Sequence, residues 1–413
     1  MKKNALIIYY IILIGLIGTA IFTLFSQFNM KGEYTESTVG GWYYQVAFVS
    51  NILLTIASIY SFIIYRKSFP VIVSICYALL LLLIFVTSFS DMGMFSKTPS
   101  MFYSPKGIGA WINFGLLYFT AEEAYTVKIF KIFKQLCFVF IVFNLAQLAL
   151  LGTISNRDDA LNAVRDTTVY LIWVYPIFFF DSSDKTQFAK AVKYGLILLV
   201  AFFAFAIASR SYLLVIIFFI LIKLKRDLKE GKNSMVIVGI SGMALLVGYY
   251  FTANIQKFNN VKGLLSTFSG RIDDDTRTSQ LREFLDQYNY DKLFSGVGPS
   301  GKWHWSVYTK GGYEWLDNQF ILITWWFGII TCLVYIAFLV YPVIRKNPTK
   351  NLMVSNAKII IIFWILACGG FAIYATICTK LFYYFITLLI GVATLNVKQT
   401  SFLAISKDKK RIE

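Results

Sequence analysis

Long apolar stretches recur along the whole chain. A helix of about 20 residues crosses the roughly 30 Å hydrocarbon core of a bilayer. Stretches near this length predict about twelve transmembrane helices, at approximately 5–25, 44–65, 70–89, 107–121, 135–154, 164–181, 191–208, 211–225, 234–252, 317–343, 356–376 and 381–397. The hydrophobic pattern therefore predicts an all-α integral membrane protein.

The composition agrees with this interpretation. Of the 413 residues, 57% are hydrophobic and 15% are charged, which excludes a soluble globular or disordered protein. No small-residue cleavage site follows the first apolar stretch, so we expect a retained span and not a removed signal peptide.

The net charge of +17 is explained by membrane topology. If Met1 is cytoplasmic, 24 of the 39 Lys and Arg residues fall in cytoplasmic segments, and about half of the others lie in one long external loop. Basic residues in short loops favour the cytoplasmic side. We therefore expect both termini inside and a nearly neutral outer face, and nothing in this distribution indicates a nucleic-acid partner.

The long external loop, 252–316, lies between the spans of 1–251 and those of 317–413, which end in a basic cytoplasmic tail. Loops this long are usually functional when they are not disordered. Its stretch 278–288 places Leu281, Phe284, Leu285 and Tyr288 at helical spacing. The pattern predicts an amphipathic helix on the bundle or membrane surface, capped by Thr278 or Ser279.

Two arginines are candidates for binding an anion. Arg210 stands in a Ser-Arg-Ser break between two apolar stretches, and Arg277 stands at the start of the amphipathic helix. Guanidinium groups bind phosphate oxygens in a bidentate manner. For Arg210, the alternative to anion binding is an interfacial position in which its side chain contacts lipid headgroups. Arg271 and Arg282 are further candidates, although pairing with nearby aspartates is favoured for them.

The sequence Gly296-Val297-Gly298-Pro299-Ser300-Gly301 satisfies the GxGxxG pattern. A dinucleotide site needs a preceding strand, a following helix and a cytoplasmic location. None of these is predicted here. We expect a structural turn, with its N–H groups open to an anion as a secondary interpretation.

Other polar residues near the end of the loop are candidates for acid–base chemistry. Asp317 and Asn318 stand at the outer mouth of the tenth span, where Asp317 either serves as a general base or caps the following helix. His304, the single histidine, lies between two tryptophans, so an interfacial aromatic anchor is favoured over a catalytic base. The five cysteines fall in apolar stretches and predict neither a disulfide framework nor a metal site.

Together these elements resemble the O-antigen polymerase and O-antigen ligase superfamily of bacterial surface-polysaccharide enzymes. The resemblance rests on the Arg277-led helix, the turn 293–299, the pair Asp317-Asn318, the pair Phe327-Gly328 and the Ser-Arg-Ser at 209–211. These motifs cover about residues 205–335, and topology alone carries the resemblance elsewhere. Each motif is loose, whereas their order and spacing are fairly specific.

The resemblance implies a GT-C-like, metal-independent glycosyltransferase of the inner membrane that uses no cofactor. It implies polymerisation of undecaprenyl-diphosphate-linked repeat units into O-antigen, capsule or a related polysaccharide on the outer face. Arginines would hold the diphosphate leaving group, and a base would assist the acceptor hydroxyl. The candidates for that base are Asp317, Glu314 and His304.

Two alternatives stay open. Ligases of this superfamily carry His at the position of Asp317, so this departure favours a polymerase over transfer of the polymer to lipid A-core. A twelve-span transporter of lipid-linked oligosaccharides is the other alternative, but the chain has no detectable symmetry between its halves. The implied partners are the lipid-linked donor and acceptor, the bilayer, a chain-length regulator and a flippase.

Overall fold

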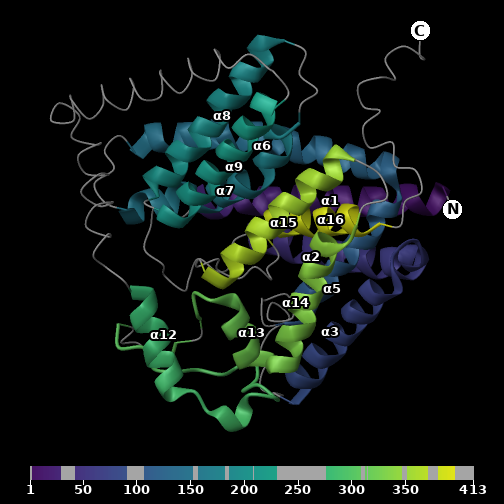
Figure 1. Ribbon diagram of the computed structural model, residues 1–413, viewed down its shortest axis with the longest axis vertical. Coiled ribbons are helices and arrows are strands. Elements are labelled where there is room, and N and C mark those ends of the chain that lie inside the picture. Colours follow the sequence, from purple (N-terminus) through teal and green to yellow (C-terminus); the bar gives the residue numbers. More distant parts are fainter. Residues whose placement is uncertain are drawn as a thin grey trace. The chain divides into compact units, whose positions relative to one another are not determined.

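A computed structural model describes residues 2–28, 42–90, 107–151, 157–181, 186–207, 209–229, 276–307, 312–313, 315–346, 351–370 and 380–395. Within these ranges all regular secondary structure is helical, apart from an isolated antiparallel bridge between Trp303 and Tyr313. The elements, labelled as in Figure 1, are α1 (Lys2–Phe28), α2 (Trp42–Tyr65), η3 (Arg66–Ser68), α3 (Val71–Ser90), α5 (Ile108–Ile112), η4 (Asn113–Ala121), α6 (Glu123–Leu151), α7 (Arg157–Phe179), α8 (Gln187–Ala206), α9 (Arg210–Lys229), α12 (Thr276–Gln287), η6 (Tyr290–Lys292), α13 (Gln319–Phe327), α14 (Ile329–Ile344), α15 (Leu352–Gly370) and α16 (Leu381–Thr394).

Six helices in the described ranges are long and apolar enough to cross a membrane. They are the apolar parts of α1, α2, α3, α6, α8 and α15. Three shorter apolar segments, Ile108–Ala121, Ile329–Ile344 and Leu381–Thr394, add to them. These features are those of a helical membrane protein, and the total of twelve spans stays a prediction.

The span predicted over 317–343 is not a single helix. The chain breaks at Gly328, which separates α13 from α14 and has a φ of 85°. Residues with a side chain rarely adopt this conformation, and a Cβ here would overlap the carbonyl oxygen of Phe294. The apolar pattern did not reveal the break because both flanking segments are hydrophobic. The span predicted over 234–252 lies outside the described residues.

Two further predictions about helix ends are wrong. The amphipathic helix α12 begins at Thr276, so Thr278 and Ser279 lie inside it and do not cap it. The cap of α13 is Asn318 and not Asp317, because the Asn318 Oδ1 accepts a hydrogen bond from the Ile321 N–H. The predicted start of α12 is displaced by three or four residues and that of α13 by one.

The chain divides into two compact units. Unit 1 comprises Met1–Phe22, Val39–Phe130 and Asp275–Glu413, and unit 2 comprises Thr23–Thr38 and Lys131–Asp274. Each is described separately below.

The centre of unit 1 is η4, whose residues Asn113–Thr120 are all buried between α2 and α16. Two glycines allow this close approach. A Cβ on Gly115 would meet the carbonyl oxygen of Ser58 on α2, and a Cβ on Gly391 of α16 would meet that of Leu117. Small residues commonly bring membrane helices together in this way.

A buried polar network ties the same three elements together. Asn113 accepts a hydrogen bond from the Thr55 hydroxyl (3.0 Å) and donates one to the Tyr384 hydroxyl (3.3 Å). Tyr384 in turn donates to Asn51 Oδ1 (2.8 Å). Each side-chain amide or hydroxyl in this network therefore has a partner inside an apolar environment, where an unpaired polar group would be costly.

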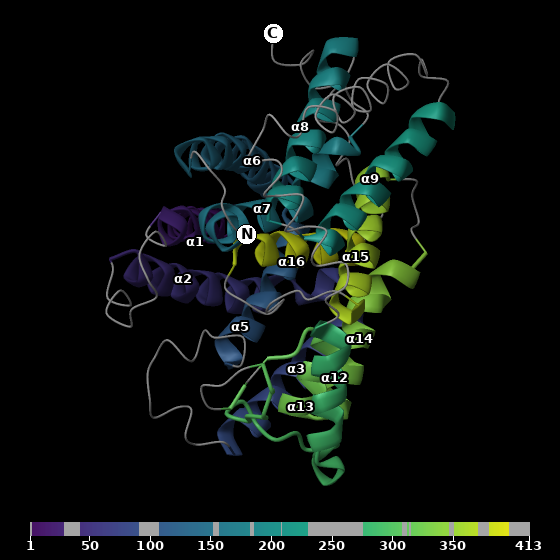
Figure 2. The same ribbon diagram turned by 90° about the vertical axis from the view of Figure 1, so that its left-hand side faces the viewer.

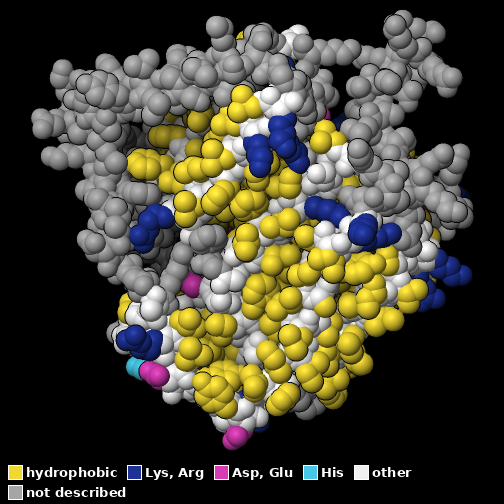
Figure 3. Space-filling view, viewed as in Figure 1, with side chains coloured by type: hydrophobic (Ala, Val, Ile, Leu, Met, Phe, Trp, Pro, Cys, Tyr) yellow, Lys and Arg dark blue, Asp and Glu magenta, His cyan; other side chains and the backbone are white. Residues whose placement is uncertain are grey.

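Unit 1 also has an apolar outer surface. Exposed hydrophobic side chains line α3 and continue on α14 and α15, where Ile330, Leu333 and Leu366 are about half exposed. Figure 3 shows hydrophobic side chains covering much of this face with few charged groups among them. Such a surface suits contact with lipid tails.

The two ends of α15 differ in chemistry. Near its first end, Lys358 donates a hydrogen bond to the Arg345 carbonyl, and Arg345 donates one to the Thr394 carbonyl. At its other end, Gly369 accepts a hydrogen bond from Asn318, which caps α13. Two basic residues therefore lie near one end of this helix, and Asn318, which was predicted to be external, lies at the other.

Unit 2 contains most of α6 together with α7, α8 and α9. Helices α7, α8 and α9 pack against one another, and Tyr170 of α7 donates a hydrogen bond to the Phe133 carbonyl of α6. Its buried polar contacts include the Thr167 hydroxyl with the side chains of Gln27 and Asn144, and Asn144 with Thr168. Hydrogen bonds between helices of this kind stabilise membrane bundles.

Candidate functional site

Helix α12 is the scaffold of the described part of the loop that was predicted to be external. Its Phe284 is 1% exposed and packs edge-on against Trp303 and Trp325, with ring centroids 5.5 and 5.4 Å away. Leu285, predicted on the same apolar face, is 42% exposed. The buried face of α12 is thus narrower than the sequence suggested and is centred on Phe284.

The polar side chains of α12 hold the segment 304–306. The Gln287 amide donates to the His304 carbonyl (2.7 Å) and accepts from the His304 N–H (2.9 Å). One turn earlier, Glu283 accepts from the N–H of Ser306 (2.8 Å) and from its hydroxyl (2.7 Å). These four hydrogen bonds satisfy polar groups along one edge of the segment, as a neighbouring β-strand would.

The Ser306 contacts also change the acidity of Glu283. Hydrogen bonds from the Ser306 N–H and then from its hydroxyl lower the pKa of the Glu283 carboxyl below its ordinary value, with a smaller contribution from the charge of His304. Donors that bind the ionised carboxylate favour it over the protonated acid.

The glycine-rich turn docks against α13. The Val297 N–H donates to the Trp325 carbonyl (2.8 Å) and the Gly298 N–H to the Trp326 carbonyl (3.1 Å). Gly296 and Gly298 have φ values of 72° and 90°, so both positions favour glycine. These two N–H groups satisfy carbonyls at the end of α13 and are not turned toward an anion.

A pocket lies where α12 meets the start of α13 in unit 1, and we call it the α13 pocket. It has a volume of about 140 Å³ and is lined by Thr278, Gln280, Leu281, Leu316, Asp317, Asn318 and Gly369. Figure 1 shows α12, α13 and α14 in a row at this end of the unit, and in Figure 2 α12 lies in front of the other two. Three separate stretches of sequence therefore form its wall.

Two amide side chains fix the geometry of the pocket wall. The Gln280 Oε1 accepts a hydrogen bond from the Asp317 N–H (3.1 Å), which ties α12 to the residue before the cap. Asn318 uses both ends of its amide, since it accepts from the Ile321 N–H (3.1 Å) and donates to the Gly369 carbonyl (2.6 Å). The backbone of Asp317 is therefore fixed by a hydrogen bond, and the residue is partly exposed in the pocket wall.

The structure brings together only some of the residues that the sequence singled out. Asp317 and Asn318 line the α13 pocket, and Arg277 directly precedes the pocket residue Thr278. Arg282 is exposed on α12, and His304 is exposed on the segment that α12 holds; neither lines the pocket. Glu314 and Arg271 lie outside the described residues.

Trp303, one of the two tryptophans of the predicted interfacial anchor, is buried in the protein. Its side chain is 5% exposed and packs against Phe284 and Tyr313. The alternation of aromatic and polar residues at 303–305 is the pattern of an extended segment with one buried face.

Arg210 belongs to unit 2. It is the exposed first residue of α9, directly after the short connection from α8. Ile207 and Tyr212, on either side of this connection, pack against Ala163 and Val164 of α7. The predicted break between two apolar helices is thus present and is held by packing.

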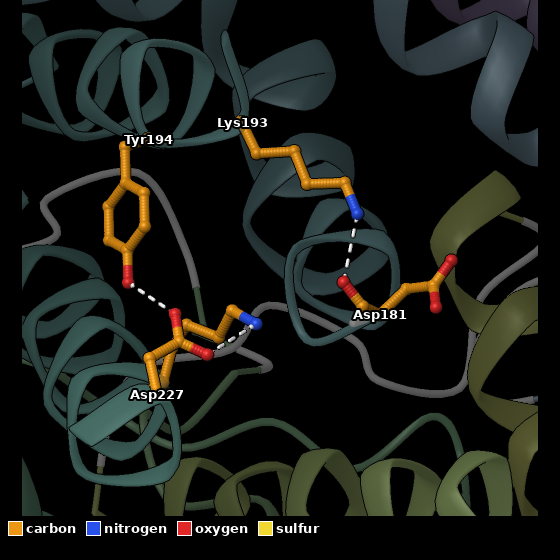
Figure 4. A network of polar contacts seen from close by, with 5 residues as sticks. Asp181, Lys193, Tyr194 and Asp227 are labelled. Atoms are coloured by element: carbon orange, nitrogen blue, oxygen red, sulfur yellow. Dashed lines mark hydrogen bonds and ion pairs between the residues drawn. The ribbon is translucent and has the colours of Figure 1, made fainter. Parts of the chain in front are cut away.

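A buried ionic cluster in unit 2 was missed by the sequence interpretation. Asp227, 6% exposed, pairs with Lys223 of the same helix (3.0 Å) and accepts a hydrogen bond from the Tyr194 hydroxyl of α8 (3.0 Å). Nearby, Lys193 donates to the Asp181 carbonyl (2.9 Å) (Figure 4). The available signal was the i,i+4 spacing of Lys223 and Asp227 at the end of an apolar stretch. These contacts join the ends of α7, α8 and α9.

The described residues contain no group of three or more His, Cys, Asp or Glu side chains that would hold a metal ion. Comparison of the chain with protein-family models, with curated proteins and with solved structures finds no match. The residues and their geometry therefore carry the functional argument.

Proposed function

We propose that this protein is a membrane glycosyltransferase that polymerises undecaprenyl-diphosphate-linked repeat units on the outer face of the cytoplasmic membrane. The observation that supports it most is the α13 pocket, where a carboxylate, a capping amide and the first turn of an Arg-led helix meet. The apolar helices around it suit a substrate that stays in the bilayer through its lipid.

In this proposal Asp317 acts as the general base. It removes the proton from an acceptor hydroxyl while that oxygen attacks the anomeric carbon of the donor sugar. The bond between the anomeric carbon and the diphosphate oxygen breaks, and its electron pair leaves with the lipid diphosphate. The products are the lengthened glycan on the acceptor lipid, a free lipid diphosphate and a proton on Asp317.

Arg277 and Arg210 are the residues proposed to bind diphosphate. Negative charge accumulates on the leaving diphosphate in the transition state, and guanidinium groups placed there stabilise it. Arg277 is the second residue of α12 and Arg210 the first residue of α9. Each is tested on its own, because each belongs to a different unit.

The test is the length distribution of surface polysaccharide in cells whose only copy of the protein is a variant. We expect Arg277→Ala, Arg210→Ala and Asp317→Asn to reduce long polymer by about a hundredfold or more at normal membrane levels. Lys292→Ala is the matched control, because it removes an exposed basic residue in η6 away from the pocket and leaves polymer unchanged.

The intermediates that accumulate separate the alternatives. Single lipid-linked repeats on the outer face agree with a missing polymerase. Repeats retained on the cytoplasmic face would replace the proposal with a transporter, and full-length lipid-linked polymer that never reaches lipid A-core would replace it with a ligase. Normal polymer in both arginine variants contradicts the proposed mechanism.

A further inference from the structure

Gln319, the first residue of α13, has an unusual environment. Its side chain is 4% exposed, and neither Oε1 nor Nε2 has a hydrogen-bond partner. Buried amides are nearly always paired, because desolvation without a partner is costly. An amide that is kept in this state therefore calls for an explanation.

The neighbouring amides have partners. Gln280, 3% exposed, is bonded to the Asp317 N–H, and Asn318 is bonded at both ends. Gln319 follows Asn318 directly in the chain, but its side chain is not among those that line the α13 pocket. Of these three amides, two build the wall and the third is left without a protein partner.

We infer that the Gln319 amide binds a sugar of the substrate when that sugar enters the α13 pocket. This inference rests on the proposed function and identifies the part of the substrate that this site takes. The three rotatable bonds of glutamine allow the amide to turn from its buried position toward a ligand that contacts the preceding residues Asp317 and Asn318. A sugar supplies the hydrogen bonds that the amide lacks within the protein.

The chemistry of the amide defines the ligand further. A carboxamide presents a donor and an acceptor side by side. A diphosphate offers acceptors only and would leave Oε1 unpaired. A sugar edge with adjacent hydroxyls, or with an acetamido group, offers a donor and an acceptor and satisfies both atoms. Gln319 is thus assigned to the sugar, whereas the arginines are assigned to the diphosphate.

The size of the pocket agrees with this assignment. Its volume of about 140 Å³ is below the roughly 300–1,000 Å³ of pockets that enclose drug-sized ligands. It suits one sugar ring and not an oligosaccharide.

The experiment uses the purified full chain in lipid nanodiscs. Gln319→Met keeps the length of the side chain and removes its polar atoms, and Gln280→Met does the same for an amide with a protein partner. We expect the melting temperature of Gln319→Met to equal or exceed that of the wild type, because no bond within the protein is lost. We expect that of Gln280→Met to fall.

Binding is measured on the same samples by the rise in melting temperature with millimolar N-acetylglucosamine, glucose or inorganic pyrophosphate. We expect one of the two sugars to stabilise the wild type and not Gln319→Met, and the stronger sugar distinguishes an acetamido group from a diol. The response to pyrophosphate is expected to be equal in the two proteins. In polymerisation assays, the half-saturating concentration of lipid-linked acceptor should rise about tenfold in Gln319→Met.

Three results would overturn the inference: a melting temperature of Gln319→Met as low as that of Gln280→Met, an unchanged sugar response in Gln319→Met, or no sugar response in the wild type. Failure of the proposed function gives a different outcome. In that case the wild type makes no polymer, while the sugar response still decides the role of Gln319.

Discussion

Two regions of unit 1 bury side-chain amides with opposite results. Around η4, Asn113 is 0% exposed, and its amide is bonded to Thr55 and to Tyr384. At the start of α13, Gln319 is almost as deeply buried and has no partner for either polar atom. The same chemical group is thus satisfied by the fold in one region and left unsatisfied in the other.

The difference separates an amide that stabilises the fold from an amide that is available to bind a ligand. A polar group buried in an apolar bundle holds helices together only when its partners are part of the protein. An unpaired group weakens the fold and is retained at functional sites that gain from it elsewhere. The α13 pocket, whose wall includes the preceding residue Asn318, is where a gain of this kind would arise.

The strongest test of the paired region is Asn113→Leu. The substitution leaves the Thr55 hydroxyl without its acceptor and removes one bond to Tyr384, so we expect the free energy of unfolding to fall by about 2–3 kcal/mol. Unfolding in mixed micelles with increasing dodecyl sulfate measures this change.

Thr55→Val is the matched control for this network. It removes one hydroxyl and leaves the bond between Asn113 and Tyr384 intact, so the loss should be about 1 kcal/mol. An Asn113→Leu variant as stable as the wild type would mean that pairing does not stabilise this region.

At the α13 pocket, the adjacent residues Asn318 and Gln319 allow a direct comparison. Asn318→Ala removes the cap of α13 and the bond to the Gly369 carbonyl, and we expect a loss of about 1–2 kcal/mol. Gln319→Met should lose nothing in the same unfolding titration. Equal losses in the two variants would indicate a structural role for both amides.

Much of the fold could be predicted from the sequence, because the length of an apolar stretch depends only on residues that are adjacent in the chain. The helices over 5–25, 44–65 and 70–89 correspond to α1, α2 and α3, and the amphipathic pattern near 278–288 corresponds to α12. The break at Gly328 was not predicted, since it depends on the approach of Phe294 from more than thirty positions earlier in the chain. Contacts between distant residues leave no periodic signal.

Only part of the candidate site was predicted, because the rest depends on contacts between residues that are distant in the chain. Asp317 and Asn318 were recognised because a carboxylate and an amide beside an apolar stretch are conspicuous. Gln280 looked like one polar residue of a surface helix, and Gly369 like part of an apolar span. Only the folded chain shows that both line one pocket with Asp317. The partners of the amides, and thus the contrast with Gln319, depend on that arrangement.

The bonds between Glu283 and Ser306 provide a smaller test, in which pairing is controlled by pH. Ser306 donors lower the pKa of Glu283 in the folded protein, so the stability from this pairing is present above the unfolded value of about 4.3. It is lost as the pH falls through the lower folded value. We expect the hydrogen-exchange protection of the Ser306 N–H, corrected for intrinsic rates, to be constant near neutral pH and to fall below pH 4. In Glu283→Gln the protection should be lower and independent of pH, whereas wild-type protection that persists below the folded pKa would show that the carboxylate does not hold this segment.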